Sequence, residues 1–116
     1  MYLWNRTVPD SEPSNVTAEG NSPFTLYVDW NGVDRASMNG DPLGYHVFVF
    51  HQSDPATALS NLTVLFNEES VTFDGLEPSN TYISRVCAFN SIGDGPCEQS
   101  TGRTMDSRMC LSLIHI

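Results

Sequence analysis

The chain has 116 residues, 40% of them apolar, and a formal net charge of −9 at pH 7. This length is enough for one domain with a modest core. All five basic residues are arginines that do not cluster, so the sequence offers no surface for a nucleic acid, which needs grouped positive charges. No apolar run approaches the roughly 20 residues of a membrane-spanning helix, so we expect no membrane contact by this segment.

Short stretches of alternating apolar and polar residues run through most of the chain. In residues 24–30, Leu26, Val28 and Trp30 share one face, which is typical of a half-buried strand. No stretch repeats its apolar residues with the period of a helix. Loops are expected at residues 31–43 and 51–60, the second interrupted by Pro55. The seven expected strands cover residues 15–19, 24–30, 44–50, 61–66, 70–73 and 82–90, with a last one through Cys97 to Thr104.

The strand at residues 44–50 is expected to carry aromatic side chains on both faces. Its alternation turns Tyr45 inward and turns Phe48 and Phe50 outward. Two outward aromatic residues leave two possibilities: neighbouring side chains cover them, or this face is available to a partner.

A proline turn and a tyrosine mark a corner between the fifth and sixth strands. Pro78 fixes φ and favours a turn, and Tyr82 opens the next strand. From there its hydroxyl is expected to reach back to a backbone group of the corner, as in two-sheet sandwiches. The expected structural core comprises Trp30, Tyr45, Leu76, Tyr82 and Val86.

Taken together, these residues resemble a fibronectin type III module over about residues 13–104. The resemblance rests on Pro13 to Thr17, Trp30, Gly44 to Val47, Leu76-Glu77-Pro78 with Tyr82, Val86 to Asn90, Gly93 to Pro96, and Arg103-Thr104. It implies an all-β, seven-stranded antiparallel Greek-key β-sandwich with an immunoglobulin-like fold. The family's integrin-binding variant carries Arg-Gly-Asp in the last hairpin. Here that loop has no arginine, so integrin binding by that route is not expected.

Two cysteines flank the glycine-containing hairpin before the last strand. If Cys87 and Cys97 face each other, the loop is centred on Ile92 and Asn90 pairs with Asp94. Cys87 then points outward, and a cross-strand disulfide is within reach. The alternative is two unpaired thiols. A zinc site is not expected, because no second cysteine pair or histidine pair accompanies them. The third cysteine, near the C-terminus, makes the count odd.

Three Asn-X-Thr motifs are candidate N-glycosylation sites, at Asn5, Asn15 and Asn61. Chance occurrence is the alternative in a chain rich in asparagine, serine and threonine. Asn15 and Asn61 are expected at strand starts, which makes them the better acceptors.

The two ends of the chain suggest a piece of a tandem array. Residues 6–11 echo residues 103–107 at an offset of 97 residues, close to one module. Residues 1–12 are therefore predicted to be the end of a preceding module and a linker, and residues 13–104 the module itself. Residues 105–116 are predicted to be a linker and a non-native tail, because the last six residues match a translated transposase sequencing adaptor.

The sequence contains no grouping that predicts catalysis, a cofactor or a metal site. Its serines lack a base placed to activate them, and its histidines lack partners at ligand spacing. The loop acids are expected to be solvated, with a weak calcium site as a minor alternative. A fold alone names no ligand.

The function hypothesis follows from the resemblance. It is a non-catalytic, extracellular spacer and protein–protein interaction module of a cell-surface adhesion or receptor protein. The alternative is an accessory module in the ectodomain of an enzyme, a receptor-type tyrosine phosphatase or a secreted glycosidase. An intracellular scaffold module is disfavoured by the glycosylation motifs and the paired cysteines. Expected partners are neighbouring modules and an unidentified protein. Candidate partner-binding residues are Asp34, Arg35, Asn39, Asp41, Ile92 and Asp94 in two loops, with Phe48 and Phe50 as a second surface.

Overall fold

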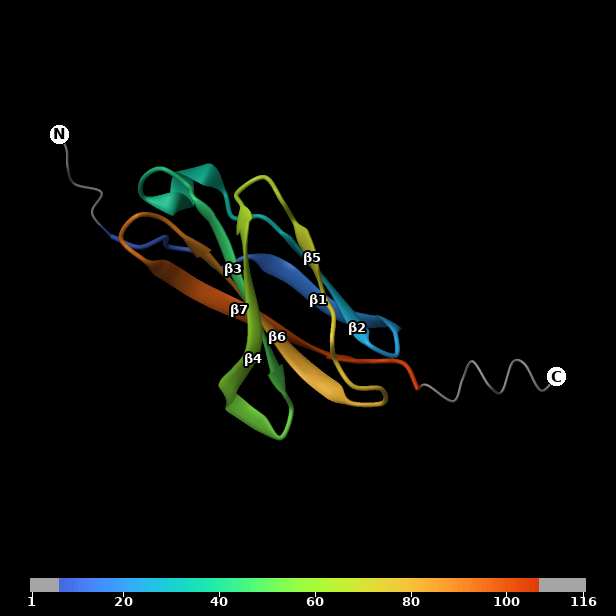
Figure 1. The fold of residues 1–116 in the computed structure, drawn as a ribbon. Helices are drawn as coiled ribbons and strands as arrows, with labels where there is room; N and C mark the ends of the chain where they lie inside the picture. Colours follow the sequence, from blue (N-terminus) through green and yellow to red (C-terminus); the bar gives the residue numbers. More distant parts are fainter. Residues whose placement is uncertain (1–6, 107–116) are drawn as a thin grey trace.

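The computed structural model describes residues 7–106 as two antiparallel β-sheets packed face to face (Figure 1). The three-stranded sheet has the order β1-β2-β5, and the four-stranded sheet has the order β4-β3-β6-β7. The elements are β1 (Ser14–Ser22), β2 (Thr25–Asn31), the 3-10 helix η1 (Arg35–Met38), β3 (Gly44–His51), β4 (Asp54–Leu65), β5 (Ser70–Phe73), β6 (Thr81–Phe89) and β7 (Asp94–Arg103). The predicted seven-stranded sandwich is confirmed. Asn5 and the tail after Asp106 lie outside the described residues. Within residues 7–106, no helix has the length and apolar content needed to cross a membrane.

The prediction of a loop at residues 51–60 is wrong, because β4 begins at Asp54 and forms a long hairpin with β3. Pro55 is compatible with this strand because β4 lies at the edge of its sheet, where a missing backbone N–H breaks no ladder. Asn61 consequently lies inside β4 and not at its start.

The core lies between the two sheets and contains all five residues expected there. Trp30, Tyr45, Leu76, Tyr82 and Val86 are each at most 8% exposed. The Trp30 and Tyr45 rings meet edge to face with centroids 5.4 Å apart, an arrangement that aromatic pairs favour.

Two core residues, Val33 and Met38, come from the loop expected at residues 31–43. Met38, at the end of η1, is fully buried and closes the loop end of the core. The sequence pattern did not indicate this, because isolated apolar residues in a loop carry no periodicity.

The corner before β6 is held by the tyrosine that opens that strand. The Tyr82 hydroxyl accepts a hydrogen bond of 2.9 Å from the backbone N–H of Glu77. The ring is 2% exposed, so this bond is sheltered from water.

Replacing Tyr82 by phenylalanine should lower the free energy of unfolding by about 1–2 kcal/mol, because the Glu77 N–H loses its acceptor. Denaturant unfolding at neutral pH measures the change. Tyr27→Phe on β2 is the matched control, since Tyr27 is half-exposed and lies away from the corner. Equal losses for the two variants would contradict the role of the Tyr82 hydroxyl.

Candidate functional site: the loop end and the outer face

Three segments meet at one end of the sandwich: the loop at residues 32–43, the β6–β7 hairpin loop at residues 90–93, and the N-terminal segment at residues 7–10 (Figure 1). Leu43 N donates to Phe89 O at 3.2 Å, which joins the first loop to the hairpin. The structure thus brings together the two loops that the sequence nominated for partner binding. We call this group of three segments the loop end.

Asn90 is the residue that joins all three segments of the loop end. Its Nδ2 donates to Thr7 O and to Met38 O, both at 2.8 Å. Its Oδ1 accepts from Ile92 N at 2.9 Å and from Gly93 N at 3.2 Å. Both donors and both acceptor positions of this amide are therefore used, at a site that is only 4% exposed.

Asn90 also explains why the predicted hairpin register is wrong at its tip. Cys87 faces Cys97 as expected, but a register shift then places Phe89 opposite Asp94. Asn90 does not pair with Asp94; it has left the ladder, and its side chain caps the loop instead. Asparagine favours such turns because its side chain can bond the backbone two residues later.

The N-terminal segment, expected to be a linker, is held against the module. Asn39 Nδ2 donates to Val8 O at 3.0 Å and to Asp10 Oδ1 at 2.8 Å, and Asp10 N donates to Ser37 O at 2.8 Å. Pro9 is fully buried and packs so closely against Gly95 that a side chain at position 95 would clash with it. The position at which the chain enters the module is consequently fixed.

The start of the 32–43 loop is anchored on two side chains. Val33 N donates to the Tyr45 hydroxyl at 3.1 Å, and Gly32 N donates to Glu69 Oε2 at 3.1 Å. Burial raises the pKa of Tyr45 above its ordinary value. The Val33 N–H opposes this rise, and the Glu69 carboxylate adds to it.

The raised pKa of Tyr45 predicts a loss of stability in alkali. The folded state favours the neutral phenol of Tyr45. The contribution of this phenol to the free energy of unfolding is therefore fully present below the unfolded pKa of about 10 and is lost as pH rises through the folded pKa. Denaturant unfolding between about pH 8 and pH 12 should show a steeper fall for the natural protein than for Tyr45→Phe. Parallel curves would contradict this assignment.

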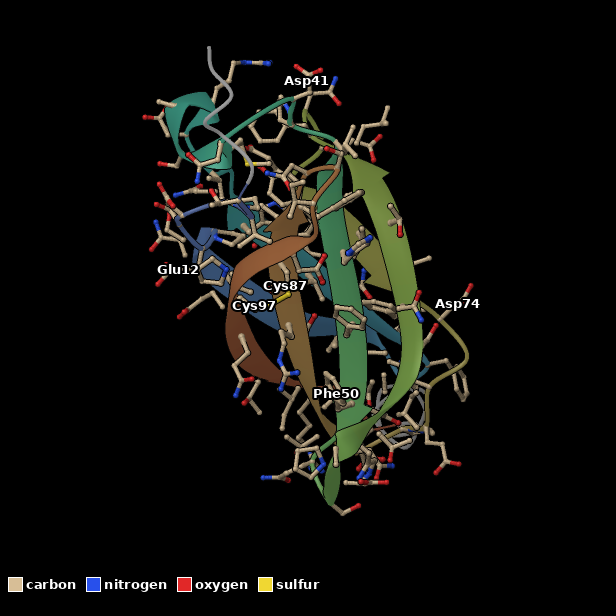
Figure 2. All side chains as sticks on the ribbon, turned by 90° about the vertical axis from the view of Figure 1, so that its left-hand side faces the viewer. Glu12, Asp41, Phe50, Asp74, Cys87 and Cys97 are labelled. Atoms are coloured by element: carbon tan, nitrogen blue, oxygen red, sulfur yellow. A yellow bond between two sulfur atoms is a disulfide. The ribbon has the colours of Figure 1, made fainter. Side chains whose placement is uncertain are left out.

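Three of the six candidate residues of the loop end, Arg35, Asn39 and Asp94, have side-chain partners within the module. Arg35 lies 5.3 Å from the centre of the Phe66 ring, and Asp94 Oδ1 lies 2.7 Å from His46 Nδ1. Asp34 is exposed and accepts from Ser37 N through its backbone oxygen. Asp41 and Ile92 are exposed; Asp41 lies at the loop end in Figure 2, on the rim of an open cleft that also includes Arg35, Leu43, Leu65 and Phe66.

The outer face of the four-stranded sheet does not present two free aromatic rings. Phe50 is 5% exposed, because the guanidinium of Arg85 lies 4.7 Å from its ring centre. The proposal that Phe50 is available to a partner is therefore wrong, and the alternative that a neighbouring side chain covers it is correct. Phe48 remains half-buried on the same face.

Cys87 and Cys97 form the predicted disulfide on this face, joining β6 to β7 (Figure 2). They are directly opposite in the register, with Cα atoms 4.3 Å apart. Cys87 is 1% exposed, whereas Cys97 is exposed, so the bond is shielded from solvent on the Cys87 side. A disulfide is typical of a protein that matures in an oxidising compartment.

Among residues 7–106, no three acidic, histidine or cysteine side chains are grouped so as to hold a metal ion. Three residues that hold the loop end together were not predicted from the sequence: Asn90, Met38 and Glu69. Asn90 had one usable signal, an asparagine at a strand end before a glycine loop. The other two had none.

Comparison with known proteins decides the family. The model of the fibronectin type III domain matches residues 11–103. This chain belongs to the fibronectin type III family.

Its relatives in this family are much longer proteins. The chain is 33% identical over 102 residues to protein sidekick-1 of Mus musculus, covering 85% of this chain and 5% of that protein. It is 30% identical over 100 residues to neural cell adhesion molecule L1 of Takifugu rubripes, covering 81% of this chain and 8% of that protein. The crystal structure of chicken CNTN1 FN1-FN3 domains has a TM-score of 0.69 and 28% identity, covering 83% of this chain and 33% of that one.

Proposed function

We propose that this fibronectin type III module is a non-catalytic spacer and protein–protein interaction module in the extracellular part of a cell-surface adhesion protein. The observation that carries the proposal is the similarity to a relative named as a neural cell adhesion molecule. The disulfide between Cys87 and Cys97 supports the extracellular placement. An enzyme ectodomain, the alternative parent, gains no support from these relatives.

The spacer role is supported by where the chain enters and leaves. Residues 7–10 lie at the loop end, joined to Asn39 and Asn90. At the other end, Thr104 N donates to Asn80 O in the turn before β6, and Met105 N donates to Ser22 O at the end of β1. Modules linked through such ends extend in a line. We propose residues 13–104 as the module itself. Residues 7–10 precede it and are held against its loop end by hydrogen bonds.

Contacts with a partner are assigned to the exposed residues of the loop end. Asp34, Asp41 and Ile92 are exposed there, on loops that the scaffold holds at fixed positions. Asn39 and Asp94 have internal partners and are assigned to holding the loops.

Antibodies raised against residues 7–106 test the placement and the role together. They should stain cells that make the parent protein without permeabilisation, and their monovalent fragments should reduce aggregation of those cells. Staining that appears only after permeabilisation would contradict the proposal. A parent protein that carries phosphatase or glycosidase activity after immunoprecipitation would favour the enzyme ectodomain instead.

A further inference from the structure

Asn61 lies beside Phe48, an aromatic residue of the outer face that remains half-buried. Residues 61–63 read Asn-Leu-Thr, and the register pairs Asn61 of β4 directly with Phe48 of β3. Directly opposite residues project to the same face of a sheet, with Cβ atoms about 5 Å apart. Asn61 is exposed and Phe48 is half-buried.

Along β3, the rings of His46 and Phe50 neighbour Phe48, each with a centroid 6.4 Å from that of Phe48. Arg85 is opposite Phe48 on β6, but its guanidinium lies over Phe50 and reaches Gln99 Oε1 at 3.4 Å. On β4, the short side chain of Asn61 stands directly opposite Phe48.

The strand that carries Asn61 is also an unprotected edge. Within the described residues, no strand pairs with the outer edge of β4. Residues 56–65 contain no charged residue, and Leu59, Leu62 and Leu65 are 38–65% exposed. Long uncharged edges invite pairing with another chain, and proteins normally protect them.

We propose that Asn61 carries an N-linked glycan whose first N-acetylglucosamine packs its apolar face on Phe48, and that this glycan covers the edge of β4. Burial of the apolar sugar face against an aromatic ring is favourable. The glycan would also obstruct the approach of another strand to the edge. This inference rests on the proposed extracellular function, since the modification belongs to secreted chains.

The modification needs one co-reactant, an oligosaccharide linked to a lipid through pyrophosphate, which donates its sugar to Asn61. The amide nitrogen of Asn61 forms a bond to C1 of the N-acetylglucosamine and gives up one proton. The bond from C1 to the pyrophosphate oxygen breaks, and the lipid pyrophosphate leaves with the bonding electron pair.

The second described motif provides the internal control. Asn15 is exposed at a φ of 51°, where the β1–β2 ladder is interrupted between Ser14 and Thr17, so no residue pairs directly with it. The Thr17 hydroxyl of its motif donates to Asp29. A glycan at Asn15 has no opposite aromatic ring and should contribute little to stability.

The test uses the full chain secreted from cells that make only high-mannose glycans. An endoglycosidase then trims each glycan to a single N-acetylglucosamine. Mass spectrometry should find Asn61 occupied. The trimmed protein should melt about 3 °C above Asn61→Gln, whereas Asn15→Gln should shift the melting temperature by less than about 1 °C. In Phe48→Leu, the effect of Asn61→Gln should disappear, and in the natural protein NMR should show contacts between sugar protons and the Phe48 ring.

Three outcomes overturn the inference. Asn61 bare in a secreted protein with an intact disulfide would overturn it and leave the proposed function standing. A melting gain that persists in Phe48→Leu, or an absence of sugar–ring contacts, would overturn the packing on Phe48. Failure of the proposed function looks different, because both asparagines would be bare and the cysteines of the parent protein would be reduced.

Discussion

Replacing Asn90 by alanine should lower the free energy of unfolding by about 3 kcal/mol, the largest effect we expect from one polar substitution. The change removes four hydrogen bonds and leaves the carbonyl oxygens of Thr7 and Met38 without this donor. Because the site is 4% exposed, water cannot readily replace the amide. Denaturant unfolding monitored by tryptophan fluorescence measures the loss.

Asn39→Gly is the matched control for this prediction. Asn39 also donates to the N-terminal segment, but it is more exposed and its φ of 54° suits glycine. It should lose less than about 1 kcal/mol. Equal losses at the two positions would show that Asn90 does not organise the loop end. Asn90→Asp should resemble Asn90→Ala, since a carboxylate cannot donate to the two carbonyl oxygens.

Removing the disulfide through Cys87→Ala with Cys97→Ala should cost about 2–3 kcal/mol, chiefly by releasing a constraint on the unfolded chain. The two cysteines are ten positions apart in the sequence, so the loop closed by the bond is short. Alanine at both positions avoids leaving a free thiol or a buried hydroxyl at residue 87.

A reducing agent provides the control for the disulfide. Reduced natural protein should unfold at the same denaturant concentration as the double variant, and the variant should not respond to the reducing agent. If the oxidised and reduced natural proteins were equally stable, the disulfide would have no role in stability.

The alternation of side chains in β2 and β3 and the corner at Tyr82 could be predicted because they depend on neighbours close in the sequence. The cysteine pair could be predicted because the hairpin between its members is short. In these places, local chemistry and the final fold agree.

Other features could not be predicted because they depend on residues far apart in the chain. Asn90 bonds groups 52 and 83 residues away, and neither Met38 nor Thr7 signals this in the local pattern. Phe50 follows the outward alternation correctly, yet Arg85 from another strand covers it. Pro55 suggested a loop, whereas its edge position allows a strand.

The extracellular placement of the module is the central claim, and protease treatment of intact cells that make the parent protein tests it most directly. Mass spectrometry of the released peptides, without reduction, should recover peptides from residues 7–106 in which Cys87 is linked to Cys97. If these peptides were released only after lysis, with both cysteines as free thiols, the extracellular placement would be contradicted.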